Sequence, residues 1–216
     1  MNILLLCNNK NLLGNKLVIY STLYCNDTIN WFIVLTEEIG EKEETNLQNL
    51  VTYMDSSSIV IFERINKVQS LEEQYSYLSE FLYIAPDCMT IQNLEKWYQK
   101  AQNNSATVLL NDTKERTCVA FIDLQSHRLN NISTYIDYDD NGISSFFWNE
   151  DIPIDYFDSR IGYSGQFSFY FNVPIIFWFA DENKSIYSMK LDQWKQLYPD
   201  FEPDVKQIQL AEQIYF

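Results

Sequence analysis

Short apolar runs alternate with amphipathic stretches over the first 124 residues of the chain. The run Ile3–Cys7 is suited to a buried strand, and it precedes Leu12–Tyr24, in which apolar side chains recur at the three- and four-residue spacing of a helix. The same order repeats in the strand-like Ile29–Leu35 and the helical Glu41–Met54, whose first turn is acidic. Ser58–Phe62 is a third predicted strand. This alternation predicts a mainly parallel sheet flanked by helices.

The pattern continues to Leu124 and then changes. The further predicted elements are a helical or mixed segment over 71–82 leading into a strand at 83–84, a helix over 90–102 with Thr90 as its N-cap, and strands over 106–110 and 118–124. Beyond residue 130, aromatic residues and the turn formers Asp, Asn and Gly dominate, which predicts a β-rich second half. Helical spacing returns only over 189–197 and 205–214.

Charge and composition exclude several classes of protein. The chain has 15 Lys and Arg against 30 Asp and Glu, a net charge of −15, which argues against a nucleic-acid partner. The longest apolar stretch, Val173–Ala180, is far shorter than the roughly 20 residues of a membrane-spanning helix. No basic segment precedes Ile3–Leu6, so we expect no signal peptide. The four separate cysteines indicate buried, reduced thiols in a cytoplasmic protein.

Several candidate residues allow two interpretations. Asp87 caps a helix beginning near Thr90 or belongs to a binding site. His127, the only histidine, is a loop residue or a general base. The aromatic groups Phe146–Trp148 and Phe167–Phe171 pack in the core or line a platform for a sugar. No Ser-His-Asp set, phosphate-binding Gly-x-x-x-x-Gly-Lys loop or Rossmann glycine fingerprint is present in the sequence.

The opening segments carry a resemblance to a known family. Met1–Asn9, Leu17–Leu23 and Ile29–Leu35 are similar to the first strand, sugar-nucleotide loop, first helix and second strand of GT-A glycosyltransferases of the glycogenin and lipopolysaccharide-galactosyltransferase type. The resemblance extends over about residues 1–190. In that family the opening loop holds uracil and ribose, which implies that Asn8 and Asn9, with Asn11, are nucleotide-binding candidates.

Two further segments correspond to the metal site of that family. Leu82–Trp97 resembles a strand, an Asp-x-Asp motif and a short helix, but it reads Ala85-Pro86-Asp87 and keeps one carboxylate. Pro174–Lys184 resembles a segment in which a histidine completes the metal shell and a lysine contacts the donor phosphates. Phe177 replaces that histidine, whereas Lys184 remains. The resemblance thus implies Asp87 as the one remaining metal ligand, and Mn²⁺ or Mg²⁺ as a cofactor only if the site is intact.

The resemblance also implies how the chain is divided. Asp139 and Asp140 stand where the family has acceptor-side acidic residues. We therefore expect a single GT-A-like domain over 1–216. It would comprise a nucleotide-binding-like half over 1–124, an acceptor-side half over 125–190 and C-terminal helices over 191–216.

Three functions follow as hypotheses. The first is a divergent glycosyltransferase-fold protein with impaired or no metal-dependent activity, which binds a nucleotide sugar and acts as a partner or regulator of an active glycosyltransferase. The second is an active hexosyltransferase that uses a nucleotide sugar, with Lys184, Lys10 and Arg160 available to stabilise the leaving diphosphate. The third is an acidic interaction or inhibitor protein, for which the charge of −15 would speed encounter with a basic partner.

Overall fold

The computed structural model describes residues 1–27, 29–36, 39–64, 70–110, 117–138, 144–157, 161–163 and 175–178. Residues 1–178 form one compact unit. The helices predicted over 189–197 and 205–214 lie outside the described residues.

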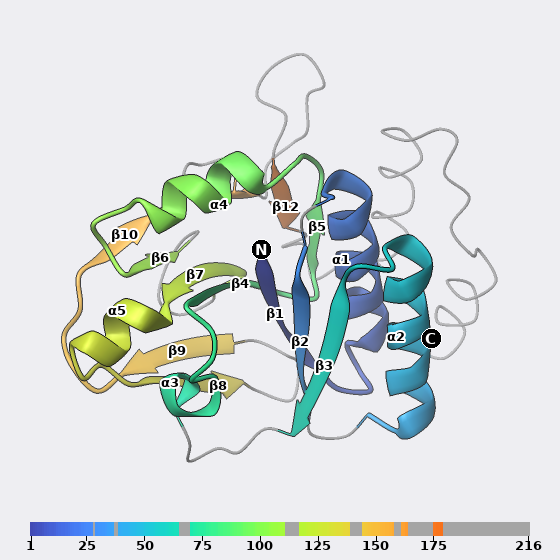
Figure 1. Cartoon of the computed structure of the whole chain (residues 1–216), viewed down its shortest axis with the longest axis horizontal. Helices are drawn as coiled ribbons and strands as arrows, with labels where there is room; N and C mark the ends of the chain where they lie inside the picture. The colour runs from blue at the N-terminus through green and yellow to red at the C-terminus, as the bar shows by residue number, and fades with distance from the viewer. Residues whose placement is uncertain are drawn as a thin grey trace, which may run out of the picture. The chain divides into compact units, whose positions relative to one another are not determined.

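The main sheet of the described chain has seven strands in the order β10-β6-β7-β4-β1-β2-β3 (Figure 1). Its strands are β1 Asn2–Cys7, β2 Trp31–Thr36, β3 Ile59–Arg64, β4 Glu80–Ile84, β6 Val108–Leu110, β7 Val119–Asp123 and β10 Ile154–Tyr156. Strands β3, β2, β1 and β4 pair in parallel, as the alternation of strands and helices predicted. β7 runs antiparallel to both of its neighbours, so the sheet is mainly but not wholly parallel. β4 is the middle strand of the sheet.

The strands at the centre of the sheet are buried on both faces. In β1 the side chains of Ile3, Leu4 and Leu5 are fully buried, and they pair in register with the equally apolar residues of β2 from Phe32 onward. A continuous apolar run without polar alternation is typical of such doubly covered strands. The unbroken apolar run Ile3–Cys7 therefore predicted strand β1 correctly.

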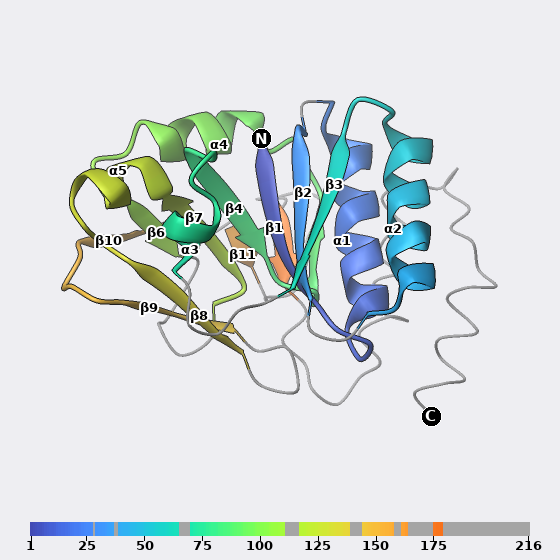
Figure 2. The same ribbon diagram turned by 60° about the horizontal axis from the view of Figure 1, so that its bottom comes forward.

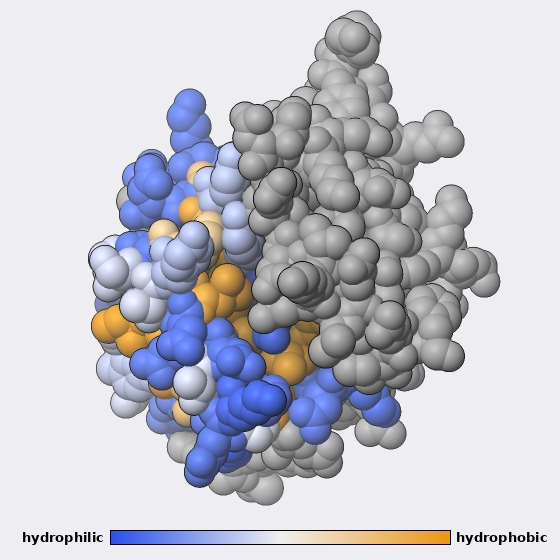
Figure 3. Space-filling model, turned by 90° about the vertical axis from the view of Figure 1, so that its right-hand side faces the viewer, coloured by the Kyte–Doolittle hydropathy of each residue, from blue (hydrophilic) through white to orange (hydrophobic). Residues whose placement is uncertain are grey.

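Five helices flank the sheet in the described chain: α1 Leu12–Cys25, α2 Glu41–Met54, α3 Leu71–Gln74, α4 Glu95–Gln102 and α5 Leu124–Leu129. Helices α1 and α2 lie side by side along the β1–β3 part of the sheet (Figures 1 and 2). α1 is buried on most of its surface, whereas α2 buries only Leu47 and Val51. The described surface on the side of α2 is accordingly mainly hydrophilic, with hydrophobic residues visible between the polar ones (Figure 3).

Smaller strands follow in the described part of the second half, and one of them pairs with a strand of the first half. β8 Thr134–Tyr138 and β9 Ser144–Trp148 form an antiparallel pair, and β11 Ile161–Tyr163, β12 Ile176–Trp178 and β5 Cys88–Thr90 form a second sheet. On β9, Phe146 is buried against Tyr83, with ring centroids 5.3 Å apart, whereas Phe147 is 52% exposed. Neighbouring residues of this aromatic group therefore point to opposite faces of the strand, and Phe146 packs in the core.

The helix predicted over 90–102 starts later than expected. Residues 88–90 pair as strand β5 with β12, and α4 begins only at Glu95. Thr90 is not an N-cap: it is buried, its hydroxyl lies 3.0 Å from that of Thr22, and its backbone N–H donates to Ser21 Oγ. The interpretation of Asp87 as the cap of a helix starting near Thr90 is therefore wrong, because a strand follows it.

Candidate functional site

The connection between β1 and α1 is shaped by its own asparagines. Asn8 Oδ1 accepts the backbone N–H groups of Lys10 (2.9 Å) and Asn11 (3.0 Å), and Asn8 N–H donates to Asn11 Oδ1 (2.8 Å). Such side-chain-to-backbone bonds are the usual way that Asn holds a tight turn. The loop is thereby fixed at the carboxyl end of β1, with Asn9 and Lys10 on the surface.

Asn15, one turn into α1, ties the helix to the end of β1. Its amide Nδ2 donates to Leu6 O (2.8 Å) and to Asn11 Oδ1 (3.0 Å), and its side chain is fully buried. Beside it, burial raises the pKa of the Cys7 thiol to about 12. Cys7 therefore stays protonated at neutral pH and is not a nucleophile here.

The turn after β4 carries Asp87. Cys88 N–H donates to Ala85 O (3.0 Å), which closes a turn with Pro86 at its second position, where the fixed φ of proline fits. Ala85 N–H donates to Cys118 O (2.8 Å), so the turn is also anchored to the start of β7. Ala85 is buried and Asp87 is half-buried.

A close backbone contact joins these two connections. A Cβ atom placed on Gly14 would lie 2.4 Å from Pro86 O, so only glycine allows α1 to approach the β4–β5 turn this closely. Because β1 and β4 are neighbouring parallel strands, both connections lie at the same carboxyl edge of the sheet. The structure thus brings Asn8 and Asn9 to the same edge as Asp87, which is where open α/β sheets bind ligands.

Strand pairing brings the segment with Phe177 near the turn that carries Asp87. β12 pairs antiparallel with β5, and Phe177 is the partner of Met89, two residues after Asp87. The two segments that the sequence resemblance matched to metal-ligand segments therefore lie on paired strands or beside them in this chain. Neither alanine at position 85 nor phenylalanine at position 177 carries an oxygen or nitrogen ligand, and the described residues contain no group of three His, Cys, Asp or Glu side chains suited to a metal ion. These residues do not fit a Mn²⁺ or Mg²⁺ clamp, which needs several oxygen or nitrogen ligands.

Asp139 and Asp140 fall between β8 and β9, and Lys184 follows β12, and all three lie outside the described residues.

His127 belongs to a different cluster, far along the chain from these connections. It lies in α5 and is fully buried, with Nδ1 3.0 Å from Glu72 Oε1 and Nε2 3.0 Å from Thr107 Oγ1. Because a carboxylate only accepts hydrogen bonds, Nδ1 carries a proton. Thr134 donates its N–H to Glu72 Oε2 (2.6 Å) and its hydroxyl to Glu72 Oε1 (2.5 Å). His127 is therefore neither a loop residue nor exposed as a general base.

The electrostatics of this cluster favour the ionised carboxylate. Burial on its own would raise the pKa of Glu72, but the hydrogen bonds from His127 and Thr134 outweigh it and hold that pKa below its ordinary value of 4.5. The cluster joins α3, α5 and β8, and we interpret it as part of the scaffold.

Comparison with known proteins identifies the fold. No protein-family model matches the chain, and no curated protein matches it. Among solved structures, the chain is similar to the galactosyltransferase LgtC in complex with donor and acceptor sugar analogues, with a TM-score of 0.60 at 10% identity over 94% of this chain and 97% of that one. An active-site mutant of LgtC gives the same TM-score and identity over 96% and 99% of the two chains. The apo-form glycosyltransferase GlyE of Streptococcus pneumoniae TIGR4 gives a TM-score of 0.50 at 9% identity, over 60% and 35%.

The fold is therefore that of the GT-A glycosyltransferases, a mixed α/β fold with a mostly parallel central sheet. None of the helices in the described part of the chain combines the length and the hydrophobicity that a bilayer-spanning helix requires.

Proposed function

We propose that this protein is a divergent glycosyltransferase-fold protein with impaired or no metal-dependent activity, which binds a nucleotide sugar and acts as a partner or regulator in glycosylation. Nucleotide binding is assigned to the carboxyl edge of β1 and β4, with Asn8, Asn9 and Asp87, and with Lys184 beyond the described residues. Asp139 and Asp140 are the proposed acceptor-side residues.

One observation carries this proposal. The turn Ala85-Pro86-Asp87 and the strand that contains Phe177 come together, yet they offer a single carboxylate between them. A divalent ion that offsets the charge of a departing diphosphate must be held by fixed ligands. Among the described residues, this supports an edge of the sheet that can hold a nucleotide but offers only one ligand of the expected metal shell.

The first prediction concerns metal dependence. UDP should bind the natural chain equally well with Mn²⁺ and with EDTA, because Asp87 alone cannot fix the ion. The double substitution Ala85→Asp with Phe177→His should make UDP binding about tenfold tighter in Mn²⁺ than in EDTA, equivalent to about 1.4 kcal/mol. Isothermal titration calorimetry measures both.

Thermal denaturation of the same variants provides the control. A carboxylate introduced at the buried Ala85 is costly without a counter-ion, so Mn²⁺ should raise the melting temperature of the double variant but not that of Phe177→His alone. Mn²⁺-dependent sugar transfer by the natural chain would contradict the proposal and would show that other acidic residues supply the ligands.

A second prediction tests the carboxyl edge itself. Asp87→Ala should weaken the binding of a UDP-sugar by about tenfold through the loss of a charged hydrogen-bond acceptor for sugar hydroxyls. The melting temperature should stay unchanged, because backbone hydrogen bonds between Ala85 and Cys88 hold the turn. Calorimetry and thermal denaturation measure the two effects.

Asp27→Ala is the matched control for Asp87→Ala. Asp27 is an exposed aspartate in the connection that leads to the amino end of β2, at the other edge of the sheet. Its removal should leave UDP-sugar binding unchanged. Unchanged binding in Asp87→Ala would show that Asp87 does not belong to the site. Tighter binding would show that the charge of Asp87 repels the diphosphate.

An active transferase that works without metal is the second candidate, and Lys10 favours it. This exposed cation lies in the β1–α1 connection at the proposed nucleotide edge, where it could offset charge on the leaving diphosphate. Release of UDP from a nucleotide sugar in the presence of EDTA would support this candidate over the inactive relative. The acidic interaction protein remains a hypothesis from the net charge.

A further inference from the structure

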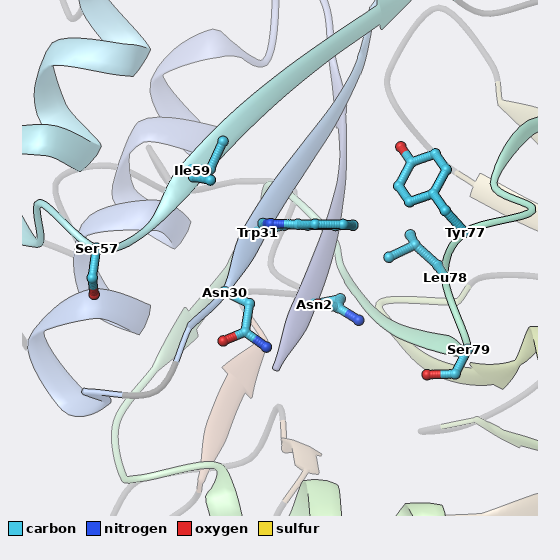
Figure 4. A pocket seen from close by; sticks show the side chains of 8 residues that line it. All are labelled: Asn2, Asn30, Trp31, Ser57, Ile59, Tyr77, Leu78 and Ser79. Carbon is cyan, nitrogen blue, oxygen red and sulfur yellow. The ribbon is translucent and has the colours of Figure 1, made fainter.

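An open pocket of about 380 Å³ lies at the amino edge of the main sheet. Asn2, Asn30 and Trp31 line it where β1 and β2 begin, and Tyr77 and Ser79 line it from the connection between α3 and β4 (Figure 4). These residues come from the opposite ends of the strands from those that lead into the candidate nucleotide edge. The pocket is therefore separate from the site of the proposed function.

Two aromatic rings form the apolar part of the pocket. The ring centroids of Trp31 and Tyr77 are 5.4 Å apart with an interplanar angle of 61°, so the rings meet edge to face. Trp31 is half-buried and Tyr77 is 52% exposed, and a hydrogen bond from the Tyr77 hydroxyl to Glu63 (3.3 Å) restrains the second ring. An aromatic face carries negative charge density and attracts the weakly positive C–H groups of an apolar ligand face.

Polar groups that both donate and accept hydrogen bonds stand beside these rings. Figure 4 shows the carboxamides of Asn30 and Asn2 and the hydroxyl of Ser79 on one side of the Trp31 ring. The Asn30 side chain is exposed and bonds to no other described residue. Asn2 donates to Glu80 O (3.1 Å), and its Oδ1 accepts no bond from the described residues. A carboxamide matches a pair of neighbouring hydroxyl groups because it offers an acceptor and donors together.

Charge and size narrow the ligand further. All the residues that line the pocket are uncharged, and the net charge of −15 disfavours phosphates and other anions. The volume lies at the low end of the range of about 300–1,000 Å³ for small-molecule sites. A neutral ligand with an apolar face and a rim of hydroxyl groups satisfies the rings, the carboxamides and the size together.

We propose that this pocket is a second carbohydrate-binding site, which takes a neutral hexopyranose unit of a glycan against Trp31 and Tyr77. The carboxamides of Asn2 and Asn30 bind its hydroxyl groups. The site goes beyond the proposed function: it needs neither the nucleotide nor a metal, and it would hold a glycan whether or not the carboxyl edge binds a nucleotide sugar.

The test uses lactose as a neutral probe and ¹⁵N NMR of the tryptophan indole groups. In the natural chain, one indole N–H signal should shift and saturate with lactose, and Trp31→Phe should remove that signal and so assign it. Asn30→Ala and Tyr77→Ala should each weaken lactose binding by about three- to tenfold, the effect of one lost polar or ring contact. Both side chains are exposed, so these variants should keep the native spectrum elsewhere.

Tyr53→Ala is the matched control, because Tyr53 is an aromatic residue on α2 that is 87% exposed and does not line the pocket. It should leave lactose binding unchanged, and UDP should not compete with lactose. The proposal is overturned if lactose shifts no indole signal, if it shifts one other than that of Trp31, or if binding survives unaltered in both Asn30→Ala and Tyr77→Ala. A failure of UDP to bind would contradict the proposed function but not this carbohydrate site.

Discussion

Replacing Glu72 by alanine is expected to lower the free energy of unfolding by about 3–5 kcal/mol, because three buried hydrogen-bond donors lose one ionised acceptor. The substitution leaves His127 Nδ1 and both donors of Thr134 without their shared acceptor in a fully buried place. Urea denaturation monitored by tryptophan fluorescence measures the change. Glu73→Ala, which removes an exposed carboxylate from the same helix, is the control and should have little effect.

The carboxylate of Glu72 also predicts that the free energy of unfolding depends on pH. Because the pKa of Glu72 is lower in the folded chain than its ordinary value of 4.5, the carboxylate stabilises the fold above that pH. This stabilisation is lost as the pH falls below 4.5 through the folded pKa. The difference in unfolding free energy between the natural chain and Glu72→Ala should therefore narrow in acid. A difference that stays constant from neutral pH to the acid limb would show that the charge of Glu72 contributes nothing.

Replacing Gly14 by alanine is expected to lower the free energy of unfolding by about 1–3 kcal/mol, even though alanine is the better helix former. The new Cβ would meet Pro86 O at 2.4 Å and Pro86 Cβ at 3.0 Å, and the backbone of the turn cannot give way as a flexible side chain can. Since Pro86 precedes Asp87, the shift should also weaken UDP binding. Urea denaturation and calorimetry measure the two effects.

Gly40→Ala is the matched control for this substitution. A Cβ on Gly40 would meet only the end of the Glu43 side chain, at 3.3 Å, which can move aside. Its effect on stability should be small. If the Gly14→Ala variant were as stable as the Gly40→Ala variant, α1 would not be held against the β4–β5 turn. That result would contradict the close contact between Gly14 and Pro86.

Much of the candidate site could be anticipated from the sequence. Asn8 and Asp87 each follow an apolar run, and the carboxyl ends of neighbouring parallel strands meet at one edge. The resemblance to the GT-A pattern related Phe177 to Asp87, although they are far apart in the chain. The pocket at the amino edge of the sheet had no comparable signal in the sequence. Its residues Asn30, Trp31 and Tyr77 belong to no motif and come together only in the folded chain.

By itself the sequence determined the order of strands and helices through residue 64 and the bounds of α2. Those elements have local causes, because a doubly covered strand is an apolar run and a helix repeats its buried face every three or four residues. Tertiary structure decided the rest. Residues 88–90 form a strand because β12 pairs with them. β7 runs antiparallel because it pairs with β4 and β6, whose direction is opposite to its own. His127 is buried because its Nδ1 finds hydrogen-bond partners in Glu72 and Thr134. Each outcome depends on partners distant in the chain, and periodicity carries no information about those.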